Sequence, residues 1–171
     1  MVFRHVESYY PTLPVSQFTW AIPPLGRVHL AVEGSVHYSL YSDAAWNSTL
    51  PSGGGLLHSI DTNTQEEQIY SISMFHQLRC INIVRREILQ RAKDRIIHRD
   101  LPPPSRLSHH CMNYLRQMIL CQSDVRLQSC RSDRGSQITV AYVTHTCNDW
   151  SAVYDAAEEN ERAYLARRTA A

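Results

Sequence analysis

The sequence predicts a mainly α-helical fold with a small β component, an α+β arrangement of two paired amphipathic helices and a short hairpin. The first observation is an internal repeat, because residues 76–89 recur in degenerate form as residues 107–120 with Cys, Asn, Arg, Ile and Leu in register. The second is helical spacing of apolar residues in both copies. The third is apolar alternation around Gly34. Two copies are too few for a stacked solenoid. A chain of 171 residues suits a single core, so we expect one domain over residues 1–171.

Residues 1–26 form a proline-rich segment, with prolines at positions 11, 14, 23 and 24. Proline blocks regular helix because it lacks the amide hydrogen and its ring clashes with the preceding turn. We therefore expect an extended arm laid over the domain.

The hairpin is predicted on either side of Gly34-Ser35. Apolar side chains alternate with polar or small ones before this pair at Val28, Leu30 and Val32, and after it at Val36, Tyr38 and Leu40. Residues 51–55, with three consecutive glycines, predict a loop. No Gly-Lys-Ser/Thr follows these glycines, which argues against a phosphate-binding loop. The polar stretch 59–68 then leads into the first repeat helix.

The first repeat helix carries a stripe of apolar residues spaced three and four apart, which predicts one face packed into the core. Its members are Met74, Leu78, Ile81, Val84, Ile88, Ala92 and Ile96. Four arginines lie away from the stripe, at positions 79, 85, 86 and 91. Pro102-Pro103-Pro104 ends any helical continuation, and Ser105 or Ser108 can cap the second helix. Such a short link favours antiparallel neighbours.

The second repeat helix and the C-terminal region follow the same rules. Periodicity predicts that the second helix buries Met112, Leu115, Ile119 and Val125. Residues 137–144 alternate enough to predict a strand. Asp149 can cap a last amphipathic helix, whose apolar or aromatic members are Trp150, Val153, Tyr154, Ala157 and Tyr164.

Charge and hydropathy exclude two classes of partner. With 17 basic and 16 acidic side chains, nothing favours nucleic acid, which basic surfaces bind. No apolar run approaches the ~20 residues that span a bilayer, so we expect no membrane span and a soluble chain. A Ser/His/Asp hydrolase is not favoured, because the sequence lacks a Gly-x-Ser-x-Gly nucleophile signature.

The two copies place a histidine close to each repeat cysteine. His76 precedes Cys80 by four residues and shares its helical face, and His110 directly precedes Cys111. Neutral imidazole ligates metals, and its pKa allows proton transfer at physiological pH. Two packed helices could therefore aim these rings into one pocket.

At these residues the chain resembles the UstYa-like family of fungal natural-product biosynthesis proteins. That family carries two His-x-x-His-Cys motifs, each followed by a helix containing Leu-Arg. The similarity extends to residues 43–46, 118–124 and 145–150, and so covers roughly residues 40–160. The resemblance implies a tailoring enzyme that closes rings in, oxidises or halogenates a peptide or polyketide, with copper as the implied metal. It also implies an N-terminal membrane helix ahead of residues 9–11, and hence the secretory lumen if an anchor was removed; otherwise we expect a soluble intracellular protein.

Two of the four motif histidines are replaced. Arg79 stands where the first motif has its second histidine, and Leu107 where the second motif has its first. Arginine stays protonated and has no lone pair for a metal. The metal set would then be His76 and His110, with His109 able to compensate in part.

The remaining candidates take supporting roles. We assign catalytic roles to His76, Arg79, His110 and Tyr114, where Arg79 supplies positive charge to a substrate carbonyl or enolate and Tyr114 an acid or hydrogen bond. Substrate binding is assigned to His109, His145 and Trp46. Arg85 and Arg116, at equivalent repeat positions, are expected to pair with carboxylates such as Asp124 or Asp149. Four of the five cysteines lie at motif positions, which predicts two disulfides or buried thiols, with the pairing left open: Cys80, Cys111, Cys121 and Cys147.

These observations give three hypotheses. The first is a redox-neutral enzyme without a cofactor that cyclises a polyketide or peptide scaffold. The second is a copper-dependent oxidase that forms rings, hydroxylates or halogenates. The third is a non-catalytic partner of an active family member. Whether the chain associates with a second copy or with another family member is left open.

Overall fold

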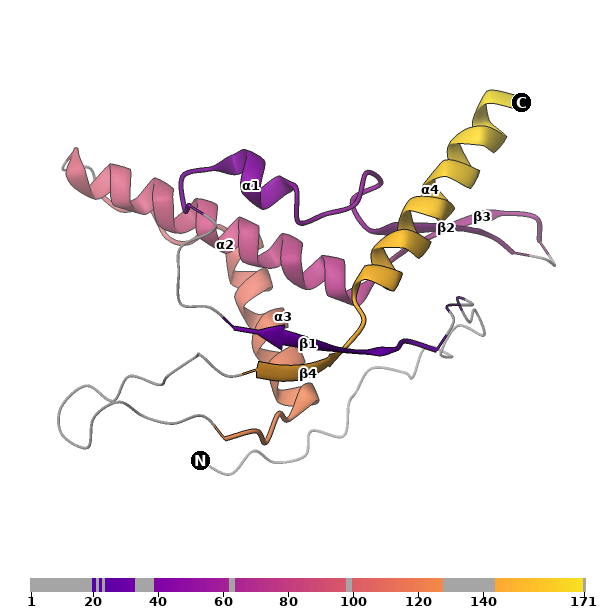
Figure 1. Cartoon of the computed structure of the whole chain (residues 1–171). Coiled ribbons are helices and arrows are strands. Elements are labelled where there is room, and N and C mark those ends of the chain that lie inside the picture. Colours follow the sequence, from indigo (N-terminus) through magenta and orange to yellow (C-terminus); the bar gives the residue numbers. More distant parts are fainter. Residues whose placement is uncertain are drawn as a thin grey trace, which may run out of the picture.

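The computed structural model describes residues 20, 22, 24–32, 39–61, 64–97, 100–127 and 144–170. Their elements follow one another as β1 (Arg27–Ala31), α1 (Asp43–Asn47), β2 (Leu56–Ile60), β3 (Glu67–Ser71), α2 (Ser73–Ile96), α3 (Arg106–Gln122), β4 (Thr144–Asn148) and α4 (Ser151–Ala170). Long helices with two small antiparallel strand pairs confirm the predicted fold class (Figure 1). Within these ranges, no helix is both long and apolar enough to cross a membrane.

The strand predicted at residues 28–32 exists, and it pairs with a strand that the sequence pattern did not predict as its partner. β1 pairs antiparallel with β4, from Arg27 opposite Asn148 to Ala31 opposite Thr144. Alternation along a segment indicates a strand and does not say which distant strand it pairs with. The second half of the predicted hairpin, at Val36 and Tyr38, lies outside the described residues, as does the predicted strand at 137–144 apart from Thr144.

The observed hairpin lies later in the chain, where a polar lead-in had been expected. β2 pairs antiparallel with β3, from Leu56 opposite Ser71 to Ile60 opposite Glu67. Only one strand of this hairpin is well covered: Leu57 and His58 in β2 are buried, whereas β3 is mostly exposed. An exposed strand needs little apolar character, which is why the sequence of β3 carries a weak signal.

The glycine-rich segment forms a tight turn against the start of α2. Gly54 and Gly55 have φ angles of +66° and +75°, which residues with a side chain rarely adopt. A Cβ on Gly55 would lie 2.3 Å from Phe75 Cβ. Gly55 O also accepts a hydrogen bond from Ile72 N at 3.1 Å. Glycine therefore lets the turn approach the first turn of α2.

The predicted apolar stripe of α2 is covered at its start, where Met74 and Leu78 pack against the core, and is wrong farther along the helix. Ile81, Ile88 and Ile96 are 41%, 56% and 76% exposed. The buried residues of α2 are instead mixed in character: Phe75, Cys80, Asn82, Arg85 and Asp94. Periodicity locates an apolar face, but the tertiary neighbours decide which face is covered.

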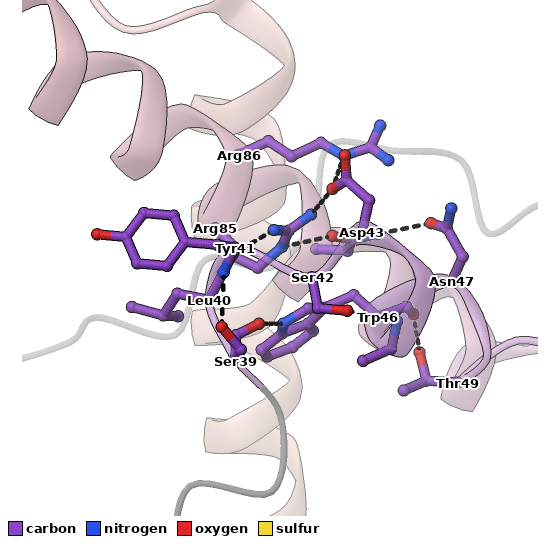
Figure 2. A network of polar contacts seen from close by, with 12 residues as sticks. Ser39, Leu40, Tyr41, Ser42, Asp43, Trp46, Asn47, Thr49, Arg85 and Arg86 are labelled. Atoms are coloured by element: carbon purple, nitrogen blue, oxygen red, sulfur yellow. Dashed lines mark hydrogen bonds and ion pairs between the residues drawn. The ribbon is translucent and has the colours of Figure 1, made fainter.

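Arg85, predicted to lie away from the packed face, is 4% exposed and anchors α1 to α2 (Figure 2). Its guanidinium donates to Leu40 O, to the Asp43 carboxylate and, at 2.8 Å, to Asn82 Oδ1. The Trp46 ring lies 5.6 Å from the Arg85 guanidinium carbon, and Trp46 Nε1 donates to Ser39 O. A buried cation is tolerated because its donors are paired.

The proline-rich link brings α3 back along α2, and Ser105 caps α3 as predicted. Ser105 Oγ accepts from Ser108 N at 3.1 Å. Contacts run in antiparallel order: Arg91 bonds Pro102 O, Cys80 forms a disulfide with Cys111, and the ring of His76 stacks on that of Tyr114. Of the two disulfides predicted, this one is present, while Cys121 and Cys147 are free thiols. The 31-residue separation closed by the disulfide contributes on the order of 3–4 kcal/mol by restricting the unfolded chain.

The predicted packing of α3 is largely wrong, whereas that of α4 is confirmed. Met112, Ile119 and Val125, all predicted to be buried, are more than half exposed. Asp149 accepts the amide of Ser151, and Val153 and Ala157 are buried. The core cluster joins Phe75 of α2 to these two α4 residues. Partly buried neighbours complete it, namely Trp20, Ile22, Leu25, Leu50, Ile72, Met74, Leu78 and Tyr154. The arm predicted at 1–26 therefore packs on the core at its described end; the rest of it lies outside the described residues.

Candidate active site

The disulfide places one histidine from each repeat copy on the same side of the helix pair. His76 precedes Cys80 by one helical turn on α2, and His110 is the residue before Cys111 on α3. Tyr114 follows His110 by four residues and so lies on the same face of α3. The sequence repeat thus produces a paired arrangement in space, as predicted.

The rings of His76, His110 and Tyr114 form a stacked group, which we call the ring cluster. His76 and Tyr114 lie 4.1 Å apart between centroids with 22° between their planes. The His76 and His110 centroids are 6.2 Å apart, and those of His110 and Tyr114 are 6.5 Å apart. His76 and Tyr114 are half-buried, while His110 is exposed. The cluster therefore has one imidazole that is partly shielded from water, His76, and one that faces solvent, His110.

Arg79 lies beside the ring cluster on the next turn of α2. Its Nη2 donates to Gly54 O, so the glycine turn fixes the guanidinium. Burial lowers the pKa of His76, and the nearby His110 and Arg79 lower it further because they disfavour a second positive charge. His76 is therefore held neutral at physiological pH, with a lone pair able to accept a proton.

A cavity of about 360 Å³ opens between α2 and the end of α3. It is lined by Gln77 of α2, by Met118 and by residues at the end of α3, and none of the ring-cluster side chains lines it. Its volume falls in the range of small-molecule sites, roughly 300–1,000 Å³.

The other predicted site residues make contacts outside the ring cluster. Trp46 contacts Arg85, which is nine residues along α2 from His76, or roughly 13 Å at the helical rise. His145, in β4, is buried near the Asp124 carboxylate, whose pKa of about 2 is set mainly by hydrogen bonds from Arg126. His109 is exposed on α3, and its amide donates to Ser105 O. The structure thus brings together His76, Arg79, His110 and Tyr114, and places Trp46 away from them along α2.

The expected carboxylate partners of the repeat arginines differ from those observed. Arg85 pairs with Asp43, not with Asp124 or Asp149. Arg116 donates to Asn113 Oδ1, while Asp124 pairs with Arg126. Arg85 and Arg116 share a sequence position but not an environment, because α1 covers only the first copy.

The donor set does not fit the copper centre that the family resemblance implies. Within the described part of the chain, no three His, Cys, Asp or Glu side chains converge as metal ligands. Cys80 and Cys111 are joined in the disulfide and offer no thiolate, and Arg79 adds a fixed positive charge beside His76. Copper therefore has no part in the reaction that we propose for this site.

Sequence reasoning missed a second histidine site, at His58 in β2. The buried imidazole stacks on Tyr164 at 3.6 Å, with Nδ1 3.2 Å from Glu67 Oε1 and Nε2 3.7 Å from Glu161 Oε2. Asn160 bonds both the amide and the carbonyl of His58. These contacts attach α4 to the hairpin. A strand signal in residues 56–60, followed by the turn residues Asp61-Thr-Asn-Thr, could have located β2, but nothing local pointed to α4.

Comparison with known proteins identifies the relatives of this chain. Residues 38–160 match the family model described as mycotoxin biosynthesis protein UstYa. The chain is 34% identical over 117 residues to "Oxidase ustYa" of Aspergillus flavus, a match covering 67% of this chain and 50% of that protein. It is 25% identical over 131 residues to "UstYa family oxidase phomYb" of Diaporthe leptostromiformis, covering 70% and 50%. The chain thus spans about half the length of these curated relatives. No solved structure matches it significantly.

Proposed function

Because the chain belongs to the UstYa family, we propose that it is a tailoring enzyme that modifies a polyketide or peptide natural product at the ring cluster. The chemistry proposed is redox-neutral ring closure. The observation that carries it is a neutral, half-buried His76 stacked on Tyr114 and placed beside the fixed cation of Arg79. A base, a cation and an acid within one cluster are the groups that enolate chemistry needs.

The proposed reaction begins with proton removal. His76 accepts a proton from the carbon next to a substrate carbonyl, and the electron pair of that C–H bond moves into the carbonyl to give an enolate. The Arg79 guanidinium stabilises the negative oxygen, which is worth most where water is partly excluded. The enolate carbon then attacks an electrophilic carbon of the same substrate and forms the ring bond.

The reaction ends with proton return. The oxygen that becomes negative at the attacked carbon takes a proton from Tyr114 or from protonated His110. His76 passes its own proton to solvent, and solvent returns one proton to whichever of Tyr114 and His110 gave it up. No electrons leave the substrate, so no oxidant is consumed. His110 exchanges protons with water readily because it is the exposed member of the cluster.

A second candidate function is favoured by the names of the relatives, since both of those described above are named oxidases. In that case the substrate would lose two hydrogens or gain oxygen, and a metal would be needed for the electrons. His76 and His110, with His109 from the next position, would be the ligands. The described residues supply no convergent third donor, so we rank this function second.

The test uses the precursor that accumulates when the coding gene is deleted in the producing organism. The purified protein is incubated with that precursor, with and without a strong chelator and with and without oxygen. The proposal predicts turnover in all four conditions. It also predicts loss of turnover in His76→Ala and Arg79→Gln, but not in Arg116→Ala, an exposed residue of α3. Turnover that requires oxygen or copper would instead establish the oxidase.

A further inference from the structure

α3 contributes nothing to the core cluster found among the described residues, which joins α2, α4 and the segments around them. Its only buried residues are Ser108 and Cys111. Its large apolar side chains face solvent instead, with Leu107, Met112, Ile119 and Leu120 between 55% and 71% exposed. The hydrophobic burial that holds most helices in place is therefore small for α3.

Other described links run mainly between α3 and α2, and they include the stacking of Tyr114 on His76. Before α3, the half-buried Arg91 donates to Pro102 O at 2.8 Å, and Ser105 hydrogen-bonds the Glu87 carboxylate. Beyond α3, Arg126 hydrogen-bonds the Cys147 side chain. Within α3, the Cys80–Cys111 bond joins two residues that are each 1% exposed, with Cα atoms 4.9 Å apart. This bond is the covalent link between α2 and α3, whose ribbons lie against each other in Figure 1.

The disulfide is also adjacent to the ring cluster in sequence. On α3, His110 comes immediately before Cys111 and Tyr114 three residues after it. On α2, His76 lies one turn before Cys80. A rotation or slide of α3 would move both of its rings relative to His76, and the bond prevents it at the point nearest the rings.

We propose that the Cys80–Cys111 disulfide is the positioning element of the ring cluster, so that the site is assembled only in the oxidised protein. The bond takes no part in the reaction. Its role is to hold His110 and Tyr114 against His76, a task that core packing performs for α4 but not for α3. The consequence for activity rests on the proposed function, whereas the consequence for structure does not.

The experiment reduces the disulfide in the folded protein. Dithiothreitol transfers two electrons and two protons to the bond, which gives two thiols while the reagent closes to its own cyclic disulfide. Two structural readouts follow: the nuclear Overhauser contact between the His76 and Tyr114 rings, and amide hydrogen exchange in α3 and α4. Turnover of the accumulated precursor is measured on the same samples.

The proposal predicts that reduction abolishes the ring contact and speeds α3 amide exchange by about tenfold or more, while α4 amides change by less than about twofold. Reduction should also abolish turnover, and reoxidation should restore the ring contact, the α3 protection and turnover. Cys80→Ala/Cys111→Ala should reproduce the reduced state, whereas Cys121→Ala, which removes an exposed free thiol of α3, should behave as the parent.

Two results would overturn the proposal. In one, the ring contact and α3 protection survive reduction, which would mean that other contacts position α3. In the other, the amides of α4 lose protection from exchange together with those of α3, which would mean that the bond stabilises the whole fold and does not specifically position α3. If the structural signals change as predicted but neither state turns over the precursor, the positioning role stands and the proposed function fails.

Discussion

Arg85 and Arg116 show at the scale of single residues how a repeat can diverge in role. Both occupy the same position in their copies, but Arg85 is 4% exposed within the α1–α2 network and Arg116 is exposed. The hydrogen bond from Arg85 is the main reason why the pKa of Asp43 lies below its ordinary value. Sequence position alone could not distinguish the two, because the difference comes from the residues that pack around each.

Replacing Arg85 should therefore be costly. We expect Arg85→Ala to lower the free energy of unfolding by about 2–4 kcal/mol, because the buried Asn82 side chain loses its charged donor and the Asn82–Arg85–Asp43 network is broken. The pKa of Asp43 should rise in the same variant. Chemical denaturation and carboxyl NMR titration measure these effects. Arg116→Ala is the matched control and should stay within about 0.5 kcal/mol of the parent; equal losses in the two variants would contradict this account.

The charge of Arg79 should be visible in the titration of His76. Burial, His110 and Arg79 together lower the pKa of His76, so Arg79→Gln should raise it. In the parent protein, the lowered pKa means that native His76 binds fewer protons than His76 of the unfolded chain at pH values just below the ordinary histidine pKa of about 6.5. This contribution to stability is present above that pH and is lost as pH falls through the native pKa.

NMR of the His76 ring protons across pH measures this effect. Arg86→Gln provides the control, because Arg86 is an exposed residue of the same helix that contacts Asp43. A His76 pKa that does not respond to Arg79→Gln would show that the guanidinium does not act on the ring.

At the scale of elements, the glycine turn depends on close approach to α2. Gly55→Ala would place a methyl group 2.3 Å from Phe75 Cβ at a φ of +75°. We expect a loss of about 2–5 kcal/mol from overpacking and backbone strain combined. Thermal or chemical unfolding measures it. Gly26→Ala, where no atom lies within 4 Å of the added carbon, should be nearly neutral; a neutral Gly55→Ala would mean that the turn is not packed as described.

The helices could be predicted from the sequence more securely than their packing. The repeat predicted α2 and α3, and the prolines and serine between them predicted the link and the start of α3. These signals could be used because they act through the local backbone. The buried faces could not be predicted, because the α2 stripe at Ile81 and Ile88 is exposed while Arg85 is buried. Burial depends on α1, the glycine turn and α4, which come from other parts of the chain. The sequence did not predict the pairing of β1 with β4 for the same reason.

At the scale of the whole molecule, the sequence predicted which residues of the helix pair lie together, and their catalytic roles stay predictions. The repeat and the family resemblance placed His76, Arg79, His110 and Tyr114 together, and the structure brings their side chains to one side of the α2–α3 pair. The His58 site was missed because its partners Glu161 and Tyr164 come from α4, more than a hundred residues away. Long-range contacts of this kind leave no local pattern.

Mass spectrometry tests the central claim most directly. It compares the mass of the precursor that accumulates in the deletion strain with the mass of the product that the purified protein forms from it. Redox-neutral ring closure at the ring cluster predicts a product of equal mass, or one lighter by a single water. It also predicts that His76→Ala forms no product. A product lighter by two hydrogens, or heavier by an oxygen atom, would contradict the account and assign oxidative chemistry to this chain.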